Sequence, residues 1–155
     1  MITASTDFSE TDAGLVAKRL VDEGRLTKEE LEIADIKALN RFLESPLCKK
    51  LQSADEIYKE LPFNIHIDAK HLSESAEGET VQLQGTIDCL AIWGDTILIV
   101  DFKTDKITNS NLNERIELYR TQLEYYKLGV QKLFPGKNIS ASIYFLSIDH
   151  EERLF

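Results

Sequence analysis

Two aspartates and a lysine stand in neighbouring apolar segments in which charged side chains are otherwise rare. Asp88 lies in the first segment, and Asp101 and Lys103 lie in the second, all between residues 85 and 104. The Gly94-Asp95 pair that separates the segments is typical of a two-residue β-hairpin turn. The sequence therefore predicts two antiparallel strands with their acidic residues near the same end.

A two-residue turn fixes the register of this hairpin. We take Trp93 to face Thr96 across the turn. In that register Asp88 faces Asp101, with Cβ atoms roughly 5 Å apart. Lys103 lies two residues after Asp101 and therefore on the same face of the strand. Facing carboxylates repel each other, more so when buried, and a divalent cation bound by their oxygen atoms would relieve the repulsion.

These three side chains suit the hydrolysis of a phosphodiester. Carboxylate oxygens are preferred ligands of Mg²⁺ and Mn²⁺. A bound metal lowers the pKa of a water molecule and neutralises charge that develops on a phosphate. Lys103 is then placed to orient or deprotonate the attacking water, or to stabilise the developing charge. The alternative is a plain hairpin with a surface ion pair, which would leave the two aspartates unrelieved.

The elements around the hairpin predict an α/β sandwich. Hydrophobic alternation indicates further strands over residues 57–68 and 139–148, and Pro62 makes the first an edge strand. Glu60 in this edge strand is a further candidate site residue. A long amphipathic helix before the last strand is indicated by apolar residues at three- and four-residue steps: Leu112, Ile116, Tyr119, Leu123, Tyr126, Val130 and Leu133. Such a helix lets the third and fourth strands pair in parallel, which gives a mixed sheet of about four strands.

The first 56 residues are predicted to form a helical layer that covers the sheet. Helices are expected over three segments: 11–23, 28–44 and 47–54. The second helix begins with a capping box of Thr27 and Glu30. Gly24 ends the first helix. Two further segments are expected to be frayed or looped: 1–10 and 73–80.

The composition limits the possible classes of protein. A length of 155 residues fits one domain, and a net charge of −9 argues against indiscriminate nucleic-acid binding. Residues 101–137 nevertheless form a net basic segment. Cys48 and Cys89 are too few for a structural zinc site or an iron–sulfur cluster, and they fit a reduced, cytoplasmic location. With no transmembrane segment and no signal peptide, we expect no membrane partner.

Three short motifs resemble those of a nuclease family: Gly-Thr-Ile-Asp at 85–88, Asp-Phe-Lys-Thr-Asp at 101–105 and Gln-Leu-Glu-Tyr-Tyr at 122–126. Together they are similar to the RecB-like branch of the PD-(D/E)XK nuclease superfamily, whose fold is a three-layer restriction-endonuclease-like core. Residues 59–63 and 26–51 further resemble the C-terminal nuclease domain of AddA (RexA), a family of bacterial ATP-dependent helicase–nuclease subunits. The resemblance runs from about residue 15 to the end of the chain, and only the combination of motifs is specific.

The resemblance assigns roles that the residues alone do not. It implies that Asp88, Asp101 and the backbone carbonyl of Phe102 bind Mg²⁺ or Mn²⁺, and that Lys103 is catalytic. It implies that four residues support the site or contact DNA: Glu60, Gln122, Tyr126 and Thr104. The implied reaction is metal-dependent, exonucleolytic hydrolysis of DNA.

The resemblance also implies a larger parent enzyme that processes double-strand breaks for recombinational repair. In such enzymes separate motor domains use ATP, a partner of the AddB (RexB) type is bound, and a single DNA strand leaves the helicase. The sequence holds no Gly-x-x-x-x-Gly-Lys-Ser/Thr motif. We therefore expect one nuclease domain, a fragment of the larger enzyme, with a helical layer at 1–56 and a catalytic core at 57–155.

One family feature has no counterpart in the sequence. The family has an upstream histidine that binds the metal, and losing such a ligand lowers metal affinity. We therefore expect the isolated domain to bind metal weakly or to be inactive. The alternative function is a catalytically silent nuclease fold that docks a partner or guides DNA.

Overall fold

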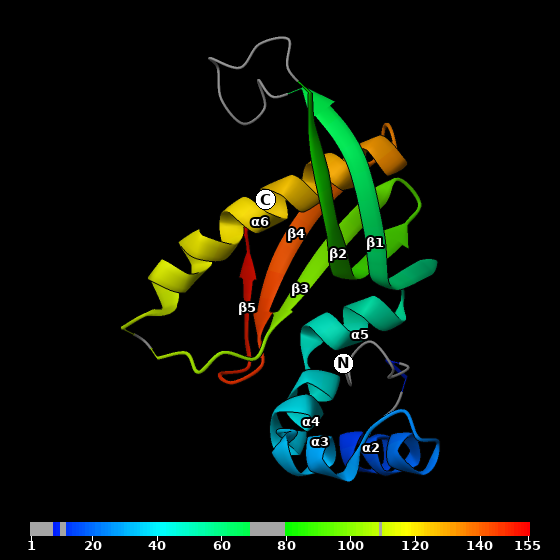
Figure 1. Cartoon of the computed structure of the whole chain (residues 1–155), viewed down its shortest axis with the longest axis vertical. Coiled ribbons are helices and arrows are strands. Elements are labelled where there is room, and N and C mark those ends of the chain that lie inside the picture. Colours follow the sequence, from blue (N-terminus) through cyan, green and yellow to red (C-terminus); the bar gives the residue numbers. More distant parts are fainter. Residues whose placement is uncertain (1–7, 10–11, 69–79, 109) are drawn as a thin grey trace.

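The computed structural model describes residues 8–9, 12–68, 80–108 and 110–155. The helices are α2 (Ala13–Asp22), α3 (Lys28–Ile33), α4 (Ile36–Glu44), α5 (Pro46–Gln52) and α6 (Leu112–Leu133). The strands are β1 (Glu56–Asp68), β2 (Thr80–Trp93), β3 (Thr96–Lys103), β4 (Asn138–Phe145) and β5 (His150–Arg153). The predicted order of helices, three strands, long helix and strand is confirmed (Figure 1). The predicted frayed segment 1–10 and the predicted loop 73–80 lie outside the described residues except for residues 8–9 and for Thr80, which begins β2.

The strands form one mixed sheet in the order β1-β2-β3-β4-β5. β1, β2 and β3 pair antiparallel, whereas β3 and β4 run parallel. A parallel pair requires a crossover connection, and α6 provides it, as the sequence predicts. β1, which contains Pro62, is an edge strand as expected.

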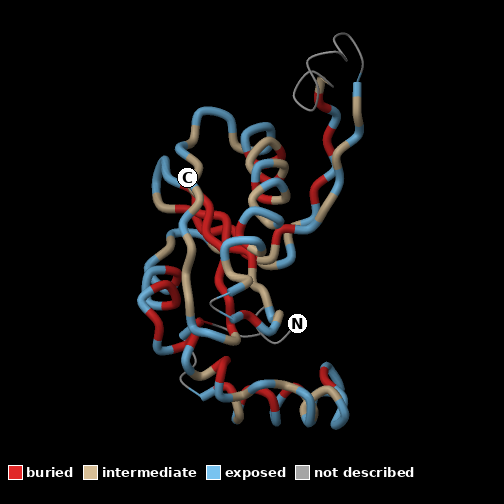
Figure 2. Tube along the Cα trace, turned by 90° about the vertical axis from the view of Figure 1, so that its left-hand side faces the viewer, coloured by how far each residue is buried: buried red, intermediate tan, exposed pale blue. Residues whose placement is uncertain are grey.

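The two faces of the sheet carry separate hydrophobic clusters, which give the fold its three layers. On one face, Ile99 of β3 joins a cluster with Leu123 of α6. On the other face, Val100 joins a cluster with Phe42 of α4. Figure 2 shows buried residues concentrated in this central sheet, with alternating burial along the outer parts of β1 and β2. The apolar pattern on both faces of β3 therefore correctly indicates a central strand.

The predicted helix over residues 28–44 is two helices in the structure, so this prediction is wrong. Ala34 has an extended backbone with a ψ of 128° and ends α3. The side chain of Asp35 then accepts a hydrogen bond from the backbone N–H of Ala38, at 2.9 Å, and caps α4. The apolar spacing continues through the break, whereas the strong capping preference of aspartate decides the local structure.

Two other helix boundaries agree with the sequence. Thr27 and Glu30 form the predicted capping box, in which each side chain accepts a hydrogen bond from the other residue's backbone N–H. Gly24, just beyond the end of α2, has a φ of 69°. This left-handed conformation is the one that makes glycine a common helix terminator.

A short fifth strand, β5, was not predicted. It pairs antiparallel with β4, from Ser142–Arg153 to Phe145–His150. Its sequence, His-Glu-Glu-Arg, has no apolar alternation and so gives no strand signal. Asp149 precedes it with a φ of 53°, a left-handed turn conformation that aspartate tolerates better than most residues.

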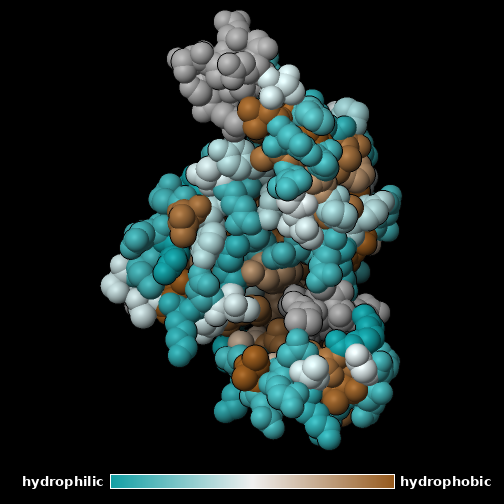
Figure 3. Space-filling view, in the orientation of Figure 1, coloured by the Kyte–Doolittle hydropathy of each residue, from teal (hydrophilic) through white to brown (hydrophobic). Residues whose placement is uncertain are grey.

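The surface of the helical layer carries exposed apolar side chains. Leu15 is 66% exposed and Ile33 is 84% exposed. Figure 3 shows hydrophobic patches on this layer within a mainly hydrophilic face. Within the described part of the chain, no helix has the length and apolar character needed to cross a membrane.

Cys89 is fully buried, and burial raises the pKa of its thiol to about 12. Because the thiolate is the reactive form, we expect iodoacetamide to modify Cys89 far more slowly at pH 8 in the folded protein than in urea. A thiol whose pKa is raised by folding stabilises the folded state below its ordinary pKa of 9.0. That contribution is lost as the pH rises from 9 toward 12.

Mass spectrometry measures the alkylation, and urea unfolding between pH 8 and pH 11 measures the stability. The alkaline loss of stability should be smaller in Cys89→Ala than in the wild type. Equal alkylation rates in folded and urea-unfolded protein would contradict the predicted protection of this thiol.

Candidate active site

The turn between β2 and β3 sets the register on which the site depends. Gly94 has a φ of 49°, which glycine adopts without steric strain. Trp93 pairs with Thr96, and Cys89 pairs with Val100, as the two-residue turn predicts. The two aspartates are the next positions along the two strands.

Just beyond the last backbone pair of β2 and β3, Asp88 contacts β3 through its side chain. The Oδ2 atom of Asp88 accepts a hydrogen bond from the backbone N–H of Phe102, at 2.9 Å. The negative charge of Asp88 is also close enough to raise the pKa of Asp101. The Asp88 carboxylate therefore lies against the β3 backbone next to Asp101, although the strand pairing itself ends at Cys89 and Val100.

Asp101 is the buried charge of the site, with only 2% of its side chain exposed. Burial raises its pKa, the Lys103 ammonium opposes the rise, and Asp88 adds to it. Apart from the Nζ atom of Lys103, 2.7 Å away, its Oδ2 atom has no hydrogen-bond partner among the described residues. A buried carboxylate with so few partners is costly for stability, which favours a functional role.

The ammonium group of Lys103 is held by residues from both β3 and α6. Besides its ion pair with Asp101, it donates a hydrogen bond to Oε1 of Gln122, at 3.1 Å. It also lies 4.2 Å from the centre of the Tyr119 ring. Lys103 is therefore fixed in position before any substrate binds.

Gln122 and Tyr126 lie one turn apart on α6 and form the second layer of the site. The Nε2 atom of Gln122 donates a hydrogen bond to the hydroxyl of Tyr126, at 2.6 Å. Since an ammonium can only donate, the amide must turn its oxygen to Lys103 and its nitrogen to Tyr126. The Tyr126 ring packs edge-on against Phe63 of β1, with centroids 5.6 Å apart.

Glu60 lies beside the aspartates in the sheet register. Lys59 pairs with Cys89 and Leu61 with Ile87, which leaves Glu60 across from Asp88. Its φ of 50° is left-handed, which is uncommon for glutamate, and such strained conformations cluster at functional sites. Its side chain is exposed and contacts no polar partner among the described residues.

The left-handed backbone of Glu60 interrupts the regular alternation of side chains between the two faces of β1. Tyr58 lies near Phe134 on the α6 face, with ring centroids 6.2 Å apart. Leu61, three residues later, packs on the same face. Regular alternation would put them on opposite faces, so the strand turns over at Glu60, next to the site.

Phe102 and Thr104 flank Lys103 in different surroundings. The Phe102 ring packs edge-on against Phe42 of α4, with centroids 5.0 Å apart, and so anchors β3 to the helical layer. Thr104 is exposed just beyond β3 and makes no hydrogen bond with the described residues. The structure thus gathers Asp88, Asp101, Lys103, Gln122 and Tyr126, whereas Thr104 stands at the rim.

A family model described as the PD-(D/E)XK nuclease superfamily matches residues 6–154. The chain belongs to this superfamily. The family predicted from the three motifs is therefore confirmed.

Curated relatives of this nuclease domain are named as subunits of an ATP-dependent helicase/nuclease. The protein from Carboxydothermus hydrogenoformans is 34% identical over 150 residues, which are 96% of this chain and 13% of the relative. The Acetivibrio thermocellus protein is 32% identical over 92% of this chain and 12% of its own length. The Moorella thermoacetica protein is 34% identical over 88% of this chain and 10% of its own length. The chain therefore spans only 10–13% of the length of these relatives.

Two residues of this nuclease domain, Tyr119 and Asp105, contact the site although the sequence assigned them no role. The Tyr119 ring contacts the Lys103 ammonium, and its hydroxyl donates a short hydrogen bond to Oδ2 of Asp105, which raises the Tyr119 pKa. Tyr119 lies one helical turn before Gln122 on the apolar stripe, and this spacing was the sequence signal that could have placed it near the site. The apolar spacing by itself predicts only a hydrophobic contact with the sheet.

The nuclease fold needs glycine at position 85, where β2 passes under the Phe63 and Tyr126 rings. A Cβ atom there would lie 3.0 Å from Phe63 and 3.3 Å from Tyr126. We expect Gly85→Ala to lower the free energy of unfolding by about 1–3 kcal/mol, as overpacked cores usually do. Urea denaturation measures the loss.

The neighbouring exposed residue gives a matched control for this prediction. Thr86→Ala should change stability by less than about 0.5 kcal/mol. Adding Phe63→Leu to Gly85→Ala should recover part of the loss, because the smaller side chain makes room. Equal stabilities of Gly85→Ala and the wild type would show that the close approach is not needed.

The site of this nuclease domain suits a divalent cation bound by oxygen. The poorly partnered Oδ2 of buried Asp101, the Asp88 carboxylate and the Phe102 carbonyl are ligands of the type that Mg²⁺ and Mn²⁺ prefer. Among the described residues, no group of three His, Cys, Asp or Glu side chains is arranged to hold a metal ion. Mg²⁺ usually keeps several water ligands and is bound through one or two carboxylates, so the two aspartates are compatible with it.

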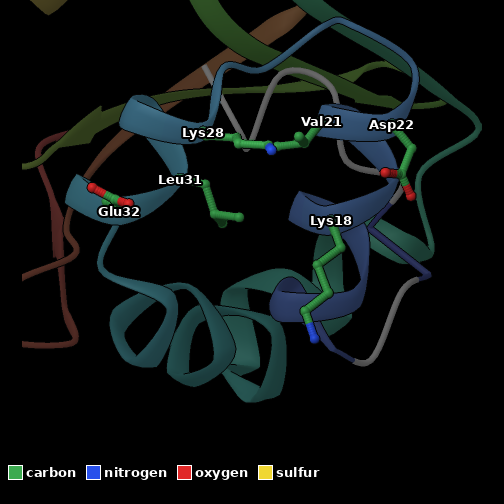
Figure 4. A pocket seen from close by; sticks show the side chains of 6 residues that line it. All are labelled: Lys18, Val21, Asp22, Lys28, Leu31 and Glu32. Carbon is green, nitrogen blue, oxygen red and sulfur yellow. The ribbon is translucent and has the colours of Figure 1, made fainter.

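A hollow lies away from these residues, between α2 and α3. It has a volume of about 370 Å³ and is lined by Lys18, Val21, Asp22, Lys28, Leu31 and Glu32. Figure 4 shows Leu31 pointing into it from α3. None of the predicted site residues of the nuclease domain lines this hollow.

Proposed function

We propose that this chain is the metal-dependent nuclease domain of a larger helicase–nuclease and hydrolyses DNA phosphodiester bonds. In this proposal Asp88, Asp101 and the Phe102 carbonyl hold Mg²⁺ or Mn²⁺, and Lys103 is the catalytic residue. The observation that carries the proposal is the buried Asp101–Lys103 pair beside Asp88 in a member of a nuclease superfamily. Stability alone gives no reason to bury these charges together.

Each residue of the cluster has a distinct task. A bound cation would lower the pKa of a water molecule and offset charge on the phosphate. Lys103 holds its ammonium where it can orient the nucleophile or stabilise phosphate charge. Gln122 keeps Lys103 in place, and Tyr126 keeps the Gln122 amide in its orientation. Exposed Glu60 and Thr104 are placed at the rim to contact DNA.

The relatives support the wider assignment. Their name describes one subunit of an ATP-dependent helicase and nuclease, and this chain matches only 10–13% of their length. We propose that ATP is used by motor domains elsewhere in the parent protein, and that a partner of the AddB type completes the complex. The substrate is then a single DNA strand leaving the helicase during double-strand-break repair, cut exonucleolytically.

A cleavage assay tests the proposal. We expect the chain, extended at its N terminus by an upstream segment that carries the family's histidine, to shorten end-labelled single-stranded DNA with Mn²⁺ or Mg²⁺ present, and not with a chelator. Cleavage that persists in the chelator would contradict metal dependence.

A catalytically silent nuclease fold is the alternative, favoured by the lack of three clustered ligating side chains among the described residues. Such a module would bind DNA or a partner without cutting DNA. Thermal unfolding with added Mn²⁺ separates a metal site from a plain structural ion pair, because a ligand that binds the folded state raises the melting temperature. Cleavage then separates the active domain from the silent one.

A further inference from the structure

The amine of Lys103 is enclosed on three sides, and one side is formed by a residue outside the nuclease motifs. Asp101 and Gln122 contact it through an ion pair and a hydrogen bond. The third side is the face of the Tyr119 ring, 4.2 Å from Nζ. Ammonium groups are attracted to aromatic faces at this distance, more strongly when water is excluded.

The Tyr119 ring is itself held in position by several elements. Its hydroxyl donates a hydrogen bond to Oδ2 of Asp105, which follows β3. The backbone carbonyl of Asp105 in turn accepts a hydrogen bond from the Ser147 hydroxyl beyond β4, at 2.6 Å. The ring also packs against Phe145 of β4, with centroids 6.3 Å apart. The Tyr119 ring is therefore held from two sides, by the segment that follows β3 and by β4.

We propose that Tyr119 and Asp105 are positioning residues for Lys103. Asp105 fixes the Tyr119 ring through the hydroxyl, and the ring face confines the Lys103 ammonium between Asp101 and Gln122. The effect on cleavage rests on the proposed nuclease function, whereas the confinement of Lys103 does not. Two kinds of measurement therefore separate the two claims.

Nuclear magnetic resonance of lysine labelled with ¹³C and ¹⁵N reports the confinement directly. Protons over an aromatic face are shifted upfield, so the ε-methylene protons of Lys103 should stand apart from those of the other lysines. Their signal is identified by its absence in Lys103→Arg. We expect Tyr119→Leu to return that signal to the range of the other lysines. Tyr125→Leu, on the same helix, is the matched control and should leave it unchanged.

Two gentler variants test the role of Asp105 and do not remove the ring. Tyr119→Phe and Asp105→Asn should each shift the Lys103 signal partway. Because both variants disturb the same hydrogen bond, the Lys103 signal in the double variant should move no further than it does in either single variant. These variants also keep the proposal testable if Tyr119→Leu does not fold.

The kinetic readout follows in variants that fold. We expect Tyr119→Leu to lower kcat about 3- to 10-fold with little change in KM, the range expected for one cation–π contact. An unshifted Lys103 signal in the wild type, or one that Tyr119→Leu, Tyr119→Phe and Asp105→Asn all leave unchanged, overturns the proposal whatever the activity. Shifted signals in the chain, together with an N-terminally extended wild type that does not cleave DNA, would instead support the positioning and count against the nuclease function.

Discussion

Asp101→Asn is expected to reduce DNA cleavage at least about a hundredfold while the fold remains intact. The substitution keeps the shape of the side chain but removes the charge that a metal ligand requires, and electrostatic groups at such sites are worth about 10²–10³ in rate. Burial raises the pKa of Asp101, so its ionised form is disfavoured in the folded state. We therefore expect the melting temperature of the metal-free variant to match or exceed that of the wild type.

The same variant separates a catalytic role from a structural one. Cleavage rates and melting temperatures should be measured on one preparation, with Asp95→Asn as the control. Asp95 lies in the exposed turn at the other end of the hairpin. A large fall in melting temperature together with unchanged cleavage would mean that Asp101 serves the fold and not the reaction.

Lys103→Met should reduce cleavage about as strongly, by roughly 10²–10⁴-fold, the range for a positioned acid or base. Its effect on metal binding should differ from that of Asp101→Asn. Methionine removes the positive charge 2.7 Å from Asp101 but leaves both carboxylates in place. The rise in melting temperature with Mn²⁺ should therefore persist in Lys103→Met and disappear in Asp101→Asn. At a hundredfold excess over Kd, that rise corresponds to about 2.7 kcal/mol.

A partly exposed lysine away from the cluster provides the control for charge removal. Lys137 lies near the hairpin turn, where it contacts Asp95 and the Gly94 carbonyl. Lys137→Met should leave both cleavage and metal stabilisation close to the wild type. Loss of the Mn²⁺ effect in Lys103→Met would place the lysine among the groups that hold the cation.

The meeting of the two aspartates could be predicted because a short turn transmits its register along the whole hairpin. Once Gly94 and Asp95 form the turn, each later pair is fixed, and the strands are too apolar to slip by one residue. The parallel pairing of β3 and β4 was predictable for a related reason, since a 22-residue helix between them allows a crossover.

The features that the sequence did not predict depend on contacts between residues distant in the sequence or on rare backbone conformations. The left-handed Glu60 carries no sequence signal, because glycine and asparagine are the usual residues at such positions. Tyr119 fits the apolar stripe of α6, so its contact with Lys103 becomes visible only when the helix lies on the sheet. β5 is held by its backbone pairing with β4, and apolar periodicity does not report such pairing.

The wrong prediction for residues 28–44 has the opposite cause, because here a clear apolar pattern was present and did not decide the structure. The apolar spacing predicted one helix, yet Asp35 ends that continuity by capping α4. A local polar contact outweighed a regular pattern. Boundaries set by single side chains are therefore less predictable than the strands and helices between them.

The most direct measurement is cleavage of end-labelled single-stranded DNA by this domain extended at its N terminus. The extension would be the corresponding upstream segment of the Carboxydothermus hydrogenoformans relative, which is 34% identical to this chain. With Mn²⁺ or Mg²⁺ we predict cleavage by the extended wild type, and its loss in extended Asp101→Asn and Lys103→Met. A folded extended wild type that leaves the DNA intact, or cleavage undiminished in both variants, would contradict a metal-dependent nuclease site at Asp88, Asp101 and Lys103.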